Sequence, residues 1–136
     1  MAVKNIIATF ASNNYLSYKT AVIMSQHHDI MINNMGDSIG LTNEEMQRLV
    51  AVLSTQPNIE RAIVYGSRAK GTNRRFSDVN MALVGKNLSH SDLNQVAMKI
   101  DDLLLPYEFD LSLYSSLTNE NLIEHIKRVG KVIYES

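Results

Sequence analysis

The residues best suited to chemistry lie in one short stretch of the chain and on one later strand. A Gly66-Ser67 pair is followed, after ten intervening residues, by Asp78 and Asn80. Side chains alternate across a strand, so Asp78 and Asn80 point to the same face. Asp110 is a third candidate, because a carboxylate in the middle of an apolar strand is unfavourable unless it is exposed or engaged. Acidic residues that project from neighbouring strands are a usual way to hold Mg²⁺ together with substrate phosphates.

The Gly66-Ser67 pair has the features of a phosphate site. Glycine lets the backbone approach a phosphate closely, and amides at the start of a short helix point toward an anion. The Ser67 hydroxyl adds a donor, and Arg68 and Lys70 could screen the remaining negative charge. The alternative for this basic cluster, which continues with two more arginines, is a solvated loop.

Three longer helices and three short apolar strands are expected to position these residues. A capping-box pattern at Thr42 to Glu45 begins the first helix. The second carries an apolar stripe that runs to Leu103 and Leu104 and stops at Pro106. The elements expected in order are a helix from Thr42 to Pro57, a strand over 62–65, a short helix over 67–71, a strand over 79–84, a helix capped by Ser89 or Ser91, a strand over 107–114, a helix capped by Thr118 and ended by Gly130, and an edge strand or tail over 132–134. This order predicts an α+β fold, a small mixed β-sheet flanked by helices.

Composition sets the limits of the function. The chain has 136 residues, no cysteine and a formal net charge of −1. The length predicts one core, and the lack of cysteine excludes disulfides and fits a cytoplasmic location. The net charge argues against direct nucleic-acid binding, and no apolar run is long enough to span a membrane.

The first 34 residues differ from the rest, because their apolar residues keep no sustained period. We expect residues 1–34 to form an atypical extension, weakly structured or helical, ahead of a domain over 35–136 that begins at Met35. The competing interpretation is a helix that docks on a partner or a second subunit.

The string GSRAKGTNRRFSDVNMAL resembles the signature of the DNA polymerase beta-type nucleotidyltransferase superfamily, most of all its minimal nucleotidyltransferase (MNT) group. The similarity extends over about residues 38–135 and implies the nucleotidyltransferase fold. It also implies that Gly66 and Ser67 hold a nucleoside triphosphate, with ATP expected, and that Asp78 and Asp110 bind Mg²⁺. Asn80 stands where the family has a second aspartate.

The resemblance also implies a partner. Minimal nucleotidyltransferases often pair with a HEPN-domain protein and can act as the antitoxin by modifying that toxin, so a homo- or hetero-oligomer is expected. The main alternative is a catalytically degenerate protein that neutralises its HEPN partner by contact alone. Transfer to a small molecule is a third hypothesis, disfavoured because residues 35–136 leave little chain for a second substrate domain.

Asn80 is expected to impair the reaction. An amide oxygen can bind Mg²⁺ but brings no charge and cannot bridge two ions, so transfer should slow by about 10²–10⁴-fold. The histidines are expected to have no chemical role, with His90 at a helix start and His125 on a helix surface.

Overall fold

The computed structural model describes residues 38–136, so the expected extension over 1–34 and the expected domain start at Met35 lie outside the described residues. The described elements alternate between helix and strand as the sequence predicts. They are α4 (Asn43–Leu53), β2 (Arg61–Tyr65), α5 (Ser67–Lys70), β3 (Val79–Val84), α6 (His90–Asp101), β4 (Phe109–Leu113), the 3₁₀ turn η2 (Tyr114–Ser116), α7 (Glu120–Val129) and β5 (Lys131–Glu135).

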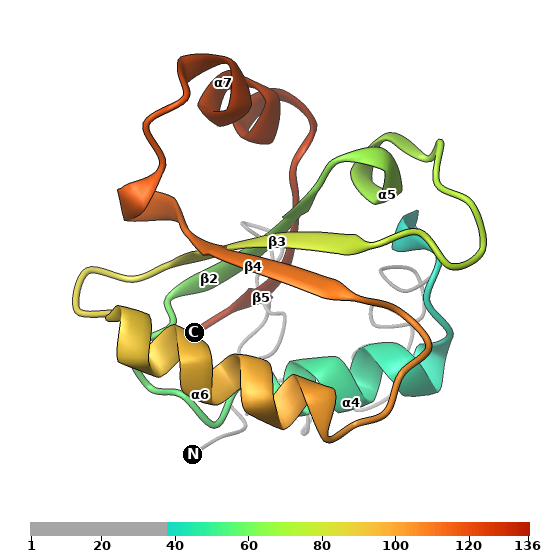
Figure 1. The fold of residues 1–136 in the computed structure, drawn as a ribbon, viewed down its shortest axis with the longest axis horizontal. Helices are drawn as coiled ribbons and strands as arrows, with labels where there is room; N and C mark the ends of the chain where they lie inside the picture. The colour runs from blue at the N-terminus through green and yellow to red at the C-terminus, as the bar shows by residue number, and fades with distance from the viewer. Residues whose placement is uncertain (1–37) are drawn as a thin grey trace.

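The strands form one mixed sheet in the order β4-β3-β2-β5. β2 pairs antiparallel with β3 on one side and with β5 on the other. β3 and β4 run parallel, joined by the crossover through α6. The segment expected as an edge strand or tail is therefore the edge strand β5, and the predicted α+β class is confirmed (Figure 1).

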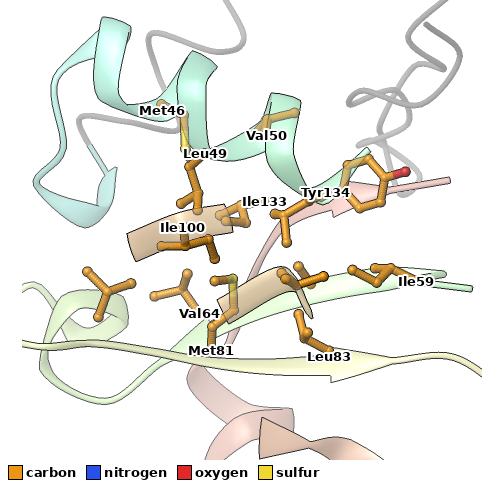
Figure 2. Close-up of a cluster of buried hydrophobic side chains, with 14 of the residues drawn as sticks. Met46, Leu49, Val50, Ile59, Val64, Met81, Leu83, Ile100, Ile133 and Tyr134 are labelled. Atoms are coloured by element: carbon orange, nitrogen blue, oxygen red, sulfur yellow. The ribbon is translucent and has the colours of Figure 1, made fainter. Parts of the chain in front are cut away.

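The main core lies between the sheet and the helices α4 and α6, which run together along one face (Figure 1). Met46 and Leu49 of α4 and Ile100 of α6 meet the inward side chains of β2, β3 and β5 in this cluster (Figure 2). Burial of alternate strand residues such as Val79, Met81 and Leu83 fits one apolar face on β3. This packing fixes the strands that carry the candidate residues.

The opposite face of the sheet is covered in part by α7. Ile63, Tyr65 and Ala82 form a smaller apolar cluster with Ile126 of α7. The short helix α5 follows β2 at one end of the sheet (Figure 1). The face under α7 is therefore apolar along β2 as far as Tyr65, and its first polar neighbour on β3 is Asn80, opposite Tyr65.

Caps decide where the helices begin. The capping box of α4 is confirmed, with Glu45 N donating to Thr42 Oγ1 at 3.1 Å and Thr42 N to Glu45 Oε1 at 2.9 Å. Ser89 is the cap of α6. The cap of α7 is Asn119, whose side chain accepts two backbone N–H groups, so the prediction of Thr118 is off by one residue.

The end of α6 differs from the prediction. The helix stops at Asp101, before Leu103 and Leu104, and Leu104 is 87% exposed with φ of 56°. The chain turns sharply here to start β4, so these leucines do not continue the apolar stripe. Within residues 38–136, no helix combines the length and apolar character needed to cross a membrane.

Candidate functional site

The sheet register places the predicted chemical side chains on one face. Asn80 of β3 pairs with Asp110 of β4 and, on its other side, with Tyr65 of β2. Residues opposite each other on neighbouring strands point to the same face, and Asp78 directly precedes β3, two residues before Asn80. Val79 N donates to Glu108 O at 2.8 Å, which extends the pairing of the two strands to this end. The structure therefore places Asn80 and Asp110 side by side near the start of two parallel strands, with Asp78 at the residue before β3.

These three side chains differ in exposure and charge. Asp78 and Asp110 are exposed, and Asn80 is half-buried, with Asp110 of β4 on one side and Tyr65 of β2 on the other. In the part of the chain that the structure describes, no three His, Cys, Asp or Glu side chains converge as a metal cluster. The candidate residues are instead two carboxylates and one amide, whose oxygens can all bind a metal ion but which together carry two negative charges.

The Gly66-Ser67 turn lies directly against this face. Gly66 has φ of 78° and ψ of −151°, a conformation that is essentially restricted to glycine. A Cβ at Gly66 would lie 2.7 Å from Asn80 Nδ2. The turn that ends β2 and the amide of β3 therefore share one small space.

The turn is held by hydrogen bonds to both sides. Gly66 O accepts from the amides of Ala69 and Lys70 at 3.1 Å each. Gly66 N donates to His125 Nε2 of α7 at 3.0 Å. The Gly66 amide is thus engaged within the protein, and the amides of Ser67 and Arg68, which open α5, are the donors with no partner inside the helix.

Arg68 has a different position from the one expected. Its side chain is completely buried, with 0% exposure. The guanidinium donates to Ile39 O at 2.8 Å, to Ser77 O at 2.9 and 3.0 Å and to Arg75 O at 3.3 Å. Contrary to the prediction from the sequence, the structure does not place Arg68 where it could contact phosphates. The buried side chain instead holds the loop between α5 and β3 through the carbonyls of Arg75 and Ser77.

The charged guanidinium of Arg68 is buried next to an aromatic ring and a carboxylate. The pKa of Arg68 is lowered from its usual value by burial, and the charges of Tyr107, Glu45 and Asp78 offset this lowering only in part. The guanidinium carbon lies 4.6 Å from the ring centre of Tyr107, whose hydroxyl donates to Glu45 Oε1 at 2.9 Å. Burial, followed by the bond to Glu45, raises the pKa of Tyr107. Arginine keeps its proton, so the buried guanidinium holds the carbonyls of Arg75 and Ser77, on both sides of Phe76.

Cationic groups that do reach solvent lie around the turn. Lys70, Arg74 and Arg75 are exposed, and the guanidinium of Arg75 lies 5.2 Å from the ring centre of Phe76. Phe76 is itself 58% exposed, two residues before Asp78. The loop that leads into Asp78 therefore presents positive charge and one aromatic ring to solvent.

His125 is the site residue that sequence reasoning missed. It lies on α7, bonds to Gly66 across 59 positions of sequence, and meets Tyr65 in an edge-on ring contact with centres 6.2 Å apart. No local pattern connects a helical histidine with a distant turn, so only the packing of α7 on the sheet reveals the contact. A hollow of about 360 Å³ opens farther along the same face, lined by Ile63, Tyr114, Ile126 and Val132 with Arg61 and Lys127.

The mixed sheet and the Gly-Ser turn beside an acidic pair define the class of nucleotidyltransferase-fold domains. The family described as polymerase beta, nucleotidyltransferase, matches residues 47–136. The chain therefore belongs to the polymerase beta nucleotidyltransferase family.

Solved structures of toxin–antitoxin complexes share the fold. One, of a toxin–antitoxin with AMP-PNP, has a TM-score of 0.56 and 22% identity over 67% of this chain and 73% of its own. Another, a tri-AMPylated HEPN toxin of Shewanella oneidensis in complex with its MNT antitoxin, has a TM-score of 0.52 and 17% identity over 68% and 71%. A third, the MntA-HepT toxin–antitoxin, has a TM-score of 0.52 and 16% identity over 70% and 74%. No curated protein matches the chain in sequence.

Proposed function

We propose that this protein belongs to the MNT group and transfers AMP from ATP to a hydroxyl of a HEPN-type partner, as the antitoxin of a toxin–antitoxin pair. The observation that carries the proposal is the register of Asn80 with Asp110, directly beside the Gly66-Ser67 turn, with Asp78 immediately before β3. Polar oxygen donors next to a glycine turn suit a nucleotide and its metal. The fold neighbours include complexes with AMP-PNP and with an AMPylated HEPN toxin.

The turn is assigned to the phosphates. Gly66 brings the backbone close to a ligand on the Asn80 side, and the Ser67 hydroxyl and amide donate to phosphate oxygens. Lys70 is exposed at the end of α5 and screens the triphosphate, joined by Arg74 and Arg75 of the loop. Arg68 acts indirectly in this proposal, since it holds the loop that leads into Asp78.

Asp78 and Asp110 would hold Mg²⁺, with the Asn80 amide oxygen as a weaker third ligand. The donor set fits the ion in kind, because all three groups offer oxygen, and Asn80 and Asp110 are register partners on neighbouring strands. When bound, Mg²⁺ polarises the attacking oxygen and neutralises the leaving pyrophosphate. Asn80 leaves the set one negative charge short, which supports severely impaired transfer in this chain.

A second candidate function has its own observation in favour. Because Asn80 leaves only two carboxylates at this site, the domain could neutralise its partner by binding alone. The partner would then be held without modification. Both proposed functions imply a cytoplasmic location, where ATP is available and a HEPN-type partner would be bound.

Labelling of the partner separates the two candidates. The chain and its Asn80→Asp variant are incubated with Mg²⁺, ATP labelled on the α-phosphate and a candidate HEPN-type partner protein. We expect the variant to label the partner about 10²–10⁴-fold faster than the unaltered chain. The matched control is Asn80→Asp combined with Asp110→Asn, which should return labelling to the low level. If both chains bind the partner and neither labels it, the function is binding alone.

A further inference from the structure

Helix α7 reaches across the sheet to the Gly66-Ser67 turn through one side chain. Gly66 N and His125 Nε2 are 3.0 Å apart, and the contact is partly buried. Gly66 directly follows β2, and α7 packs on β2 through Ile126, the residue next to His125. The bond therefore ties the turn to an element that is already fixed by apolar packing.

The chemistry of this bond defines the state of the imidazole. A backbone N–H only donates, so His125 Nε2 must accept and the ring proton lies on Nδ1. The edge-on contact with Tyr65, at an interplanar angle of 81°, restricts rotation of the imidazole. Tyr65 in turn pairs with Asn80 across β2 and β3. The imidazole is thus oriented by the same strand that presents the turn.

Gly66 needs such an anchor more than another residue would. Glycine has more accessible backbone conformations than any other residue, so without the bond to His125 the backbone of Gly66 would be restrained mainly through its carbonyl, which accepts from the amides of Ala69 and Lys70. Rotation would move the Ser67 amide and hydroxyl and would change the contact with Asn80. Holding the Gly66 amide removes this freedom before any ligand arrives, which lowers the ordering cost of binding.

We propose that His125 is a positioning residue that fixes the Gly66 peptide and so presents Ser67 to the nucleotide phosphates. This inference rests on the proposed function for its ligand. Its structural half, the anchoring of Gly66 by an imidazole acceptor, is independent of any ligand. The two halves can therefore be measured apart.

The first measurement follows hydrogen exchange of the Gly66 amide by NMR in three proteins: the unaltered chain, His125→Gln and His125→Leu. Glutamine keeps an acceptor oxygen, and leucine keeps apolar bulk without one. We expect exchange at Gly66 to rise about five- to tenfold in His125→Leu and to stay within about threefold in His125→Gln. Amides of Met81 and Val64 in the sheet core report whether the fold has changed. Unaltered protection of Gly66 in His125→Leu would overturn the proposal.

The second measurement is the affinity for ATP with Mg²⁺ by calorimetry, in the Asn80→Asp background. We expect about five- to tenfold weaker binding for His125→Leu and recovery for His125→Gln. Equal affinity in all three proteins would show that the anchor has no role in nucleotide binding and would overturn the proposal. If the Asn80→Asp protein itself does not bind ATP, the proposed function fails together with the nucleotide role of His125, and the exchange data alone report the anchor.

Discussion

Gly66 and the side chain of Asn80 leave no room between them for a methyl group. A Cβ on Gly66 would come within 2.7 Å of Asn80 Nδ2 and within 3.9 Å of its Cβ. A larger residue at position 66 would therefore displace the Asn80 side chain, and a larger side chain at position 80 would press on the Gly66 backbone.

The first prediction concerns Gly66→Ala. Alanine is strained at φ of 78° and ψ of −151°, which costs about 1–3 kcal/mol, and its methyl group pushes the Asn80 side chain out of place. We expect a lower free energy of unfolding in urea and loss of ATP binding. Gly71→Ala is the matched control, since Gly71 has φ of 79° with nothing within 4 Å of the added Cβ.

The control variant should lose about 1–2 kcal/mol for its left-handed backbone and keep its nucleotide affinity. If Gly66→Ala and Gly71→Ala behave alike in both measurements, the close approach of Gly66 to Asn80 has no functional consequence.

The second prediction concerns the buried guanidinium. Replacing Arg68 by Met removes the donors to Ile39 O, Arg75 O and Ser77 O, and leaves those carbonyls without their charged partner. We expect a loss of about 3 kcal/mol or more in the free energy of unfolding, measured by urea denaturation. Arg68→Lys should recover only part of this loss, because one ammonium cannot reproduce the planar fork.

The control for Arg68 is an exposed arginine in the loop that the Arg68 side chain holds. Arg74→Met should change stability by no more than about 0.5 kcal/mol. An Arg68→Met protein as stable as Arg74→Met would contradict the bracing role and would reopen the phosphate contact expected from the sequence.

The third prediction concerns acid stability. The backbone N–H of Ser89, then the side chain of Asn58, hold the pKa of Asp92 below its usual value. A lowered folded-state pKa means that this group stabilises the protein above the unfolded pKa, and that the stabilisation is lost as pH falls through the folded pKa. We expect Asp92→Asn to be less stable than the unaltered chain at neutral pH and equal to it in strong acid, by urea denaturation at stepped pH.

Glu135 provides a control of opposite sign. Burial, only partly offset by Arg61, raises the pKa of Glu135. The ionised form is therefore disfavoured in the folded protein, and stability falls as pH rises through this pKa. Glu135→Gln should be the more stable protein at neutral pH, with the gain vanishing in acid. If Asp92→Asn and Glu135→Gln change the free energy of unfolding at neutral pH in the same direction, the environments assigned to these two carboxyl groups are wrong.

The sequence was sufficient for the features that depend on neighbours along the chain. The capping box of Thr42 and Glu45 is a local pattern, and the structure contains both of its hydrogen bonds. The motif around Gly66 and Asp78 indicated the family and hence the sheet. The order of helices and strands followed from apolar periodicity and from the turns between elements.

Features that depend on distant contacts could not be predicted. Arg68 looked like a surface cation beside a phosphate site, because its bond to Ile39, 29 positions away, has no local signal. The contact of His125 with Gly66 was hidden for the same reason. At Leu104 the apolar stripe continued in sequence although the helix had ended, since the turn into β4 is imposed by the sheet.

Binding of ATP with and without Mg²⁺ is the measurement that tests the proposed site most directly, and it needs no partner. By calorimetry, Asn80→Asp should bind ATP at least about tenfold more tightly than the unaltered chain when Mg²⁺ is present, because the third carboxylate restores a charged ligand. The two proteins should differ little without the ion, and Asp110→Asn should remove the gain. An affinity for ATP that is unchanged by Mg²⁺, by Asn80→Asp and by Asp110→Asn would contradict a metal–nucleotide site on this face of the sheet.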